Sequence, residues 1–310
     1  MNKCRMSKFL RIACIAGLCG GIGAVALPAV AQEAQPKKAV DYDYLLPWAN
    51  KGVRLASTAE AQAKEPFQIF DNVYYVGPQS VSMYLIKTDK GLILIDSGYE
   101  YTAETELGNI RKLGFNPADI KYILITHGHS DHSAGVKKLK AATGARVGMA
   151  AGDWDVYEKP ATAHPYETIP PDLVYKEGDD VTLGNTTIHL HLTPANTTGC
   201  LSMEYTVYDH GKPYEALTLG GTGFNFPAEW TKTYIEGMER MRKLPNVRVL
   251  LPDHPQLNDI FDTEAKLKLR KPGDPNPFVQ SRQEVLDWFD TLLKAAREKY
   301  RLEQEAAKKS

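Results

Sequence analysis

Residues 122–132 read Tyr-Ile-Leu-Ile-Thr-His-Gly-His-Ser-Asp-His, and this stretch decides both the fold and the chemistry that we expect. The first half, residues 122–126, is a short apolar run bounded by polar residues, which is typical of a buried strand. The second half places three histidines and one aspartate within six residues, directly before a segment with helical patterning. Imidazole nitrogens and carboxylate oxygens are ligands that suit Zn²⁺ and similar ions. The stretch therefore predicts a metal site at the end of a strand.

The spacing within this motif indicates how its ligands divide. His127 and His129 are two residues apart, so in an extended turn both rings point to one side and hold one ion. Asp131 and His132 then turn toward a second ion. A single histidine after a strand is ordinary in a polar loop, whereas four ligand-type residues at this spacing favour a metal site.

Apolar patterns on both sides of the motif alternate between strand and helix periodicity. Such strand runs mixed with helices, with hairpins in both halves, predict two sheets between layers of helices. Residues 153–172 contain four prolines and are expected to form a loop or an irregular helical excursion. The expected strands are residues 67–76, 82–88, 92–96, 122–126, 146–150, 180–183, 187–193, 201–208, 216–219 and 247–251, and the expected helices are 101–113, 133–143, 229–243 and 283–307.

The composition excludes several classes of protein. Of the 310 residues 43% are hydrophobic and 24% are charged, which is ordinary for a globular protein and excludes disorder, collagen and coiled coil for the whole chain. The 37 basic and 38 acidic residues give a net charge of −1. This balance implies no basic face, so nucleic acid is not an expected partner.

The first 31 residues have the pattern of a secretory signal peptide. Basic residues precede the uncharged apolar stretch Ile12–Leu27, and Ala29-Val30-Ala31 supplies a small-x-small cleavage pattern. The alternative is a membrane anchor, but this stretch is shorter than the roughly 20 residues that a span needs. We expect cleavage after Ala31, a periplasmic or secreted location, and no stable membrane anchor afterwards.

The rest of the chain is expected to form one domain with an extension. Residues 32–66 are polar and form an N-terminal extension packed on the domain of residues 67–310. Its expected anchors are Tyr42, Tyr44, Leu45 and Trp48. Cys200 is the only cysteine after the leader, which excludes an internal disulfide in the cleaved protein.

The motif resembles the hallmark His-x-His-x-Asp-His of the metallo-β-lactamase superfamily, and three further segments extend the resemblance. Residues 94–98 (Leu-Ile-Asp-Ser-Gly) are similar to the family's Asp-containing strand end, and residues 193–200 are similar to its Pro-Gly-His-Thr-x-Gly segment. Residues 251–255 (Leu-Pro-Asp-His-Pro) resemble the late His-Pro segment of the third subclass of class B β-lactamases. The resemblance runs from about Phe67 to Tyr300. It implies an α+β fold, an αββα sandwich of two mixed sheets flanked by helices, with zinc at one edge.

The resemblance also implies a ligand set. One zinc takes His127, His129 and the residue at position 196, and a second takes Asp131, His132 and His254. Residue 196 is Asn here, and an amide oxygen is a weaker zinc ligand than imidazole, so only a weak or water-mediated contact is expected. We therefore expect one or two Zn²⁺ ions per chain. Nearby, His191, Trp154, Tyr157 and Cys200 are expected to pack in the structure rather than to act in the site.

By this resemblance the chain is a secreted zinc-dependent β-lactamase, with β-lactam antibiotics as small-molecule substrates. A metal-bound hydroxide opens the β-lactam amide, and Asp131 is the catalytic ligand that orients it. A second alternative is a hydrolase of the same fold that acts on a lactone, a thioester or a phosphoester. A third is a zinc-binding protein with decayed activity. The oligomeric state stays open.

The segment Gly220–Asn225 bears on that choice. The third subclass often has serines here that contact the substrate carboxylate, whereas this chain has Gly-Gly-Thr-Gly-Phe-Asn. Thr222 and Asn225 are therefore candidate substrate contacts, with a plain glycine turn as the alternative. The missing serines and Asn196 favour a substrate other than a β-lactam.

Overall fold

The computed structural model describes residues 42–46, 57–160, 165–224 and 226–309. The expected signal peptide, Trp48 and the candidate contact Asn225 lie outside the described residues. Among the helices that the structure describes, none has the length and apolar character needed to cross a membrane.

Within the described residues, the first sheet has seven strands in the order β1 to β7, antiparallel from β1 to β4 and parallel from β4 to β7. Hairpins at its start and helical crossovers afterwards account for this mixture, since parallel neighbours need a long connection. The strands are β1 (Phe67–Phe70), β2 (Val73–Tyr75), β3 (Tyr84–Thr88), β4 (Gly91–Ile95), β5 (Ile120–Leu124), β6 (Arg146–Ala150) and β7 (Leu173–Tyr175).

The described part of the second sheet has five strands in the order β12-β11-β10-β9-β8. Its neighbours are antiparallel except for β11 and β12, which are parallel. The strands are β8 (Asp180–Leu183), β9 (Thr186–Leu192), β10 (Leu201–Asp209), β11 (Lys212–Thr218) and β12 (Val247–Leu250). Both sheets are thus mixed, as the resemblance implied.

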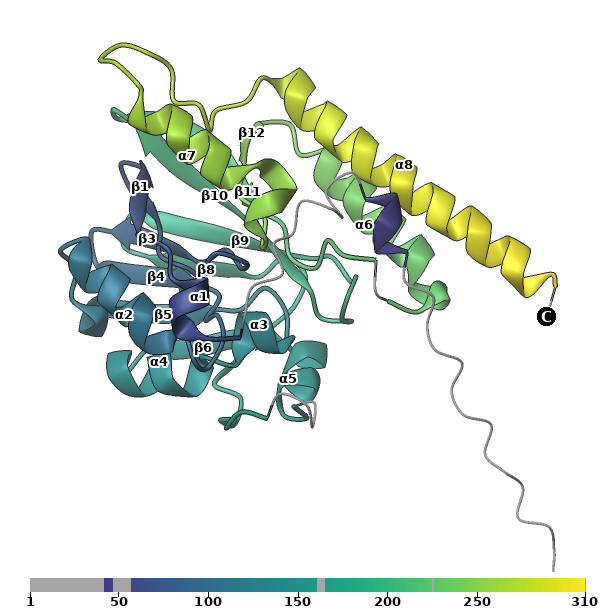
Figure 1. Ribbon diagram of the computed structural model, residues 1–310, viewed down its shortest axis with the longest axis horizontal. Helices are drawn as coiled ribbons and strands as arrows, with labels where there is room; N and C mark the ends of the chain where they lie inside the picture. The colour runs from purple at the N-terminus through teal and green to yellow at the C-terminus, as the bar shows by residue number, and fades with distance from the viewer. Residues whose placement is uncertain (1–41, 47–56, 161–164, 225, 310) are drawn as a thin grey trace, which may run out of the picture. The chain divides into compact units, whose positions relative to one another are not determined.

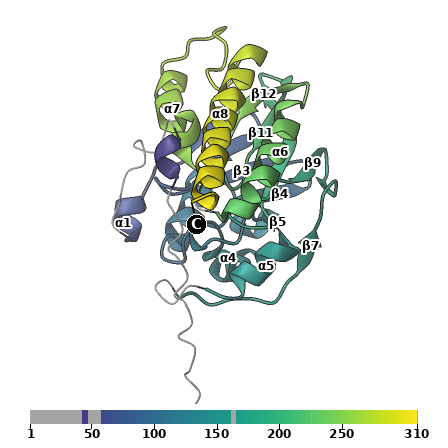
Figure 2. The ribbon, with the colours of Figure 1, turned by 90° about the vertical axis from the view of Figure 1, so that its right-hand side faces the viewer.

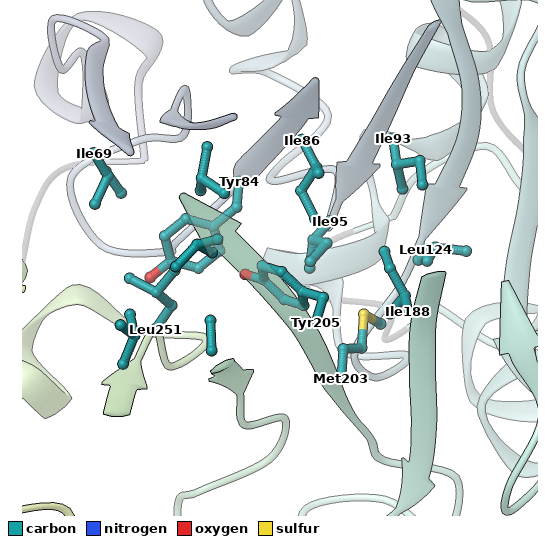
Figure 3. Packing of buried hydrophobic residues seen from close by; sticks show 14 of the residues in the cluster. Ile69, Tyr84, Ile86, Ile93, Ile95, Leu124, Ile188, Met203, Tyr205 and Leu251 are labelled. Carbon is teal, nitrogen blue, oxygen red and sulfur yellow. The ribbon is translucent and has the colours of Figure 1, made fainter. Parts of the chain in front are cut away.

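A continuous apolar core fills the space between the two sheets (Figure 3). Strand β4 shows how the sequence builds it: Ile93 and Ile95 face the second sheet, while the alternate residues Leu92 and Leu94 belong to the outer cluster. Met203 and Tyr205 of β10 lie opposite, on the facing sheet. Because both faces of β4 are buried, its sequence is apolar throughout rather than alternating.

Helices cover the outer face of each sheet, which completes a four-layer sandwich (Figures 1 and 2). The first sheet packs against α2 (Ala103–Lys112), α4 (Val136–Thr143) and α5 (Ala151–Tyr157). The second packs against α6 (Thr231–Arg242) and the long α8 (Arg282–Ala307). The predicted αββα sandwich is confirmed.

The remaining short elements are α1 (Ala59–Gln62), α3 (Ser130–Ser133), α7 (Ile260–Lys268) and the 3₁₀ turns η1 (Asp43–Leu45), η2 (Pro117–Asp119), η3 (Ala228–Trp230) and η4 (Pro255–Asn258). Of the expected anchors of the extension, Tyr42 is buried against the α6–α8 layer, as is the neighbouring Leu46. Leu45 is partly buried there, whereas Tyr44 is 66% exposed and does not anchor it.

One local prediction was wrong, and two elements were missed. Residues 67–76 form two strands, because Asp71 and Asn72 make a turn. The Asn72 side chain fixes that turn on β10, donating to the carbonyl of Thr206 at 3.1 Å and accepting from the N–H of Tyr208 at 3.0 Å. Strand β7 and helix α7 were not predicted. Both are short elements that depend on partners distant in sequence, such as the ion pair of 2.6 Å between Lys64 and Glu264 of α7.

Candidate metal centre

The histidine motif begins where β5 ends, beside the ends of β4 and β6 in the parallel part of the first sheet. His129 is extended and precedes α3, and its carbonyl accepts from the N–H groups of His132 and Ser133 at 3.0 and 2.9 Å. This tight turn places His132 within α3 (Ser130–Ser133). Gly128 is needed at the turn, because a Cβ there would lie 2.6 Å from the carbonyl oxygen of Asp153.

Asp131, His132 and His254 form the first group of ligand-type atoms. Nε2 of His132 lies 3.3 Å from Nε2 of His254 and 3.4 Å from Oδ2 of Asp131, and the third side of this triangle is 3.8 Å. Ligands held at 2.0–2.1 Å by a tetrahedral Zn²⁺ are about 3.3–3.4 Å apart. The three atoms therefore fit around one ion of that size. The structure thus brings together all three residues predicted for the second subsite.

Hydrogen bonds to the other ring nitrogens aim both histidines at this group. Nδ1 of His132 donates to Asp96 at the end of β4, at 2.9 Å, and Nδ1 of His254 donates to the carbonyl of Ser80 at 2.8 Å. Asp96 is itself held by the N–H of Thr126 at 2.7 Å. Metal-bound histidines characteristically donate their second nitrogen to a carboxylate or a carbonyl. Both rings therefore present Nε2 in the orientation of a ligand.

Electrostatics favour opposite charges within this group. Burial alone would raise the pKa of Asp131, but His132 and His254 hold it well below its ordinary value. Burial would lower the pKa of His132, but Asp131 and Asp96 raise it well above its ordinary value. An ion that binds here would displace the proton of His132, so binding and protonation are coupled.

His127 and His129 lie on the other side of His132. The centroids of the His127 and His129 rings are 4.9 Å apart, and those of His127 and His132 are 4.1 Å apart. Burial lowers the pKa of both His127 and His129, and the neighbouring His132 lowers it further. Both imidazoles are therefore neutral at pH 7, the form that binds a metal.

Asn196 lies on the loop between β9 and β10. The end of this loop is hydrogen-bonded to the residue before His127, because the N–H of Leu201 donates to the carbonyl of Thr126 at 2.7 Å. Oδ1 of Asn196 is buried and has no hydrogen-bond partner among the described residues. A buried acceptor of this kind calls for a partner such as a cation or an ordered water. This unpaired oxygen is consistent with the weak or water-mediated metal contact that is predicted for position 196.

Asp253 is the residue that sequence reasoning missed. Its carboxylate is buried, accepts from the N–H of Gly221 at 2.6 Å, and lies 3.9 Å from Nδ1 of His127. With His127 and His132 it forms a second group of buried ligand-type residues, whose ligand atoms all lie within 4.8 Å of one another. Its place next to His254 was the available signal in the sequence.

Thr222, a candidate substrate contact, is 1% exposed, and its hydroxyl donates to Asp253 at 3.3 Å, so its side chain is part of the protein interior in this structure. His191 pairs with Glu204 at 3.1 Å. Cys200, Trp154 and Tyr157 are buried, as predicted, and burial raises the pKa of the Cys200 thiol to about 12.

A cavity of about 600 Å³ opens beside Asp131. Among the described residues, its lining combines tyrosine rings with the cation of Lys138 and the carboxylates of Glu100 and Asp131. Tyr99 and Tyr101 stack with their ring centroids 4.9 Å apart, and Tyr166 and Lys138 complete this side. A volume in this range suits a drug-sized or metabolite-sized molecule. Asp131 belongs to both the cavity and the first ligand group, so a molecule in the cavity would touch the metal centre.

Comparisons with known proteins agree with this geometry. Residues 76–209 match the family model described as metallo-beta-lactamase superfamily. The chain is 32% identical over 197 residues to a hydroxyacylglutathione hydrolase of Cereibacter sphaeroides, covering 54% of this chain and 71% of that protein. It is 40% identical over 163 residues to one of Pseudomonas putida, covering 52% and 55%.

Solved structures are similar over a longer part of the chain. BJP-1, a subclass B3 metallo-β-lactamase of Bradyrhizobium japonicum, has a TM-score of 0.71 and 33% identity, covering 79% of this chain and 97% of that one. FEZ-1 metallo-β-lactamase from Legionella gormanii has a TM-score of 0.72 and 27% identity, covering 78% and 98%. The likeness to these two proteins therefore extends well beyond the segment that the family model matches.

Proposed function

Because the chain belongs to the metallo-β-lactamase superfamily, we propose that it is a zinc-dependent hydrolase that opens the amide of β-lactam antibiotics. The main support for zinc binding is the triangle of ligand-type atoms from Asp131, His132 and His254, with sides of 3.3, 3.4 and 3.8 Å. The likeness to BJP-1 over 97% of its length supports the β-lactam substrate.

Zinc bound at this centre would lower the pKa of a bound water toward about 7 and polarise the carbonyl under attack. The chain's own residues then supply orientation. Asp96 and Ser80 hold the Nδ1 protons of His132 and His254, which leaves each Nε2 free as a ligand. Asp131 stays ionised and lines the cavity, so its carboxylate accepts a hydrogen bond from the attacking water.

The cavity next to Asp131 offers apolar and charged contacts to a substrate. Its aromatic walls at Tyr99, Tyr101 and Tyr166 offer apolar contact to an acyl side chain. Lys138 supplies a positive charge for a substrate carboxylate, although Nζ also lies 3.5 Å from Glu100. The signal-peptide pattern adds the proposal that the enzyme acts in the periplasm or outside the cell.

Thioester hydrolysis is the second candidate. It is favoured by the curated relatives, which are named hydroxyacylglutathione hydrolases. A glutathione thioester also carries carboxylates and an activated carbonyl, so the same centre and cavity suit it. The two candidates differ in the bond that is broken, which makes them separable by direct assay.

The test measures initial rates of the protein, purified from cells that express the whole sequence. The substrates are a penicillin, a cephalosporin, a carbapenem and S-lactoylglutathione, each with zinc and with a chelator. We expect turnover of a β-lactam that the chelator removes. Asp131→Ala should lose that turnover, and Asp155→Ala on the exposed side of α5 should keep it. Turnover of the thioester alone would replace this function with the second candidate, and no turnover at all would contradict both.

A further inference from the structure

Among the described residues, no lysine or arginine pairs with the buried carboxylate of Asp253. The hydrogen bonds to it in the described part of the chain come from neutral donors, the N–H of Gly221 and the hydroxyl of Thr222. Buried carboxylates are normally paired with a cation or bound to a metal, because desolvation of an isolated charge is costly. A loop anchor alone needs an acceptor, which a neutral Asn would supply equally well.

The backbone holds Asp253 firmly in this place. Its N–H donates to the carbonyl of Leu219 at 3.1 Å, and its carbonyl accepts from the N–H of Ser82 at 2.8 Å. The residue is therefore fixed between the end of β11 and the start of β3. Its carboxylate approaches the centre on the side of His127, with Oδ2 at 3.9 Å from Nδ1.

Position 221 has no room for a ligand of its own. Gly221 has a φ of +71°, and a Cβ there would lie 2.4 Å from Sγ of Cys200 and 3.2 Å from Cβ of Ala195. The loop that carries Asn196 thus packs directly on Gly221, whose N–H binds Asp253. The loop that carries Asn196 and the residue Asp253 therefore both contact this glycine.

We propose that Asp253 is a metal ligand on the His127 side of the centre, where residue 196 provides an amide instead of an imidazole. This inference rests on the zinc binding in the proposed function. Two ligands of a tetrahedral zinc are about 3.3–3.4 Å apart. The present 3.9 Å between His127 and Asp253 requires a shift of about half an ångström to share one ion. An oxygen anion replaces the missing nitrogen, which keeps the ligand count.

Asp253→Asn tests whether the negative charge of Asp253 binds the metal, because it removes the charge but keeps a hydrogen-bond acceptor for Gly221. The amide oxygen still accepts from the N–H of Gly221, so the loop keeps its hydrogen bond. Competition with a chromophoric chelator gives the zinc dissociation constants, and metal analysis after dialysis gives the zinc content. We expect at least a tenfold weaker dissociation constant for one zinc. Asp209→Asn, in a partly buried carboxylate paired with Arg270 at the far end of β10, should leave zinc binding unchanged.

Two further variants separate a ligand from a structural role. Thr222→Val removes the hydroxyl that donates to Asp253 but leaves the carboxylate, so zinc binding should stay within about twofold of the wild type. Asn196→His placed in the Asp253→Asn background should restore the lost affinity, because an imidazole returns to the same side of the centre. Cooperative melting of every variant in chelator shows that folding is intact, and Asp253→Asn should melt no lower than the wild type, because it removes an unpaired buried charge.

The outcomes distinguish this inference from the proposed function. Wild-type zinc constants in Asp253→Asn would overturn it and leave Asp253 as a loop anchor, and so would equal losses in Asp253→Asn and Thr222→Val. Zinc lost in Asp253→Asn supports it even when no β-lactam is hydrolysed. A wild-type protein that binds no zinc would overturn both proposals.

Discussion

The carbonyl of Ser80 accepts a hydrogen bond of 2.8 Å from Nδ1 of His254, although the two residues are 174 positions apart in the sequence. Ser80 is in turn held by Gln62 of α1, whose Oε1 accepts from the N–H and the hydroxyl of Ser80 at 3.2 and 2.9 Å. Gln62 is 3% exposed. A histidine of the candidate metal centre is thus oriented through a side chain of the N-terminal extension.

Replacing Gln62 by Ala should therefore weaken zinc binding by about tenfold, the lower end of the effect seen for groups that orient metal-bound histidines. The loss arises because Ser80, freed from two hydrogen bonds, no longer fixes the ring of His254. Gln79→Ala is the matched control, since Gln79 contacts the same helix through its side chain but does not bind Ser80. Competition titration with a chromophoric chelator measures both. Equal constants in the two variants would refute the chain of contacts from Gln62 to His254.

This chain of contacts also shows where sequence reasoning stops. The apolar strand before the motif and the order of the ligands were predictable, because β5 and His127–His132 are contiguous and follow local rules of patterning. Ser80 and Gln62 carry no such signal. Their roles arise from the packing of α1 on the loop before β3, which no local pattern encodes. The extension was predicted to lie on the domain, but its contact with the centre was not.

Asp253 and Thr222 illustrate the same limit within the centre itself. In sequence, Asp253 is one polar residue in a Leu-Pro-Asp-His-Pro segment, and Thr222 is one polar residue in a glycine-rich segment. The parallel pairing of β11 with β12 places the two segments side by side. Only this pairing turns the Thr222 hydroxyl inward to Asp253, so a residue expected to meet substrate became part of the interior.

Glu106 on α2 should make stability depend on pH. Its side chain lies against Gly98, where a Cβ would be 2.3 Å from Oε1, and its Oε2 has no hydrogen-bond partner among the described residues. Burial raises the pKa of Glu106 from 4.5 to about 8, against a smaller opposite effect from the hydroxyl of Thr102. The folded protein therefore binds a proton that the unfolded chain releases above pH 4.5. Stability should fall as pH rises from about 4.5 to 8 and level off above 8.

Glu106→Gln removes this dependence, because Gln imitates the protonated side chain at every pH. In chelator, the free energy of unfolding of the variant relative to the wild type should increase from pH 5 to pH 8 by about 2–5 kcal/mol. Urea denaturation at several pH values measures it. Glu104→Gln, in the same turn of α2 but exposed, is the control and should follow the wild type. A constant difference between Glu106→Gln and the wild type across this range would show that Glu106 is ionised in the folded protein.

Lys299 of α8 is a buried cation, and its removal should be costly. It is fully buried, donates to Glu303, to Oγ1 of Thr231 at 2.8 Å and to the carbonyl of Phe226 at 3.3 Å, and lies over the ring of Tyr42 at 5.2 Å. Lys299→Met leaves the buried Glu303 carboxylate without its cation. We expect a loss of about 3–5 kcal/mol in the free energy of unfolding, measured by urea denaturation.

Two further variants show whether the loss of stability comes from the burial of the ion pair. Arg301→Gln, two residues along the same helix, breaks ion pairs with Glu298 and Glu305 that lie in solvent, so it should change stability little. The double replacement Lys299→Met with Glu303→Leu removes both buried charges and should recover much of the loss, because apolar residues of similar size replace a buried ion pair at little cost. If Lys299→Met were no more destabilising than Arg301→Gln, the buried pair of Lys299 and Glu303 would not stabilise the packing of α8 against α6 and the preceding loop.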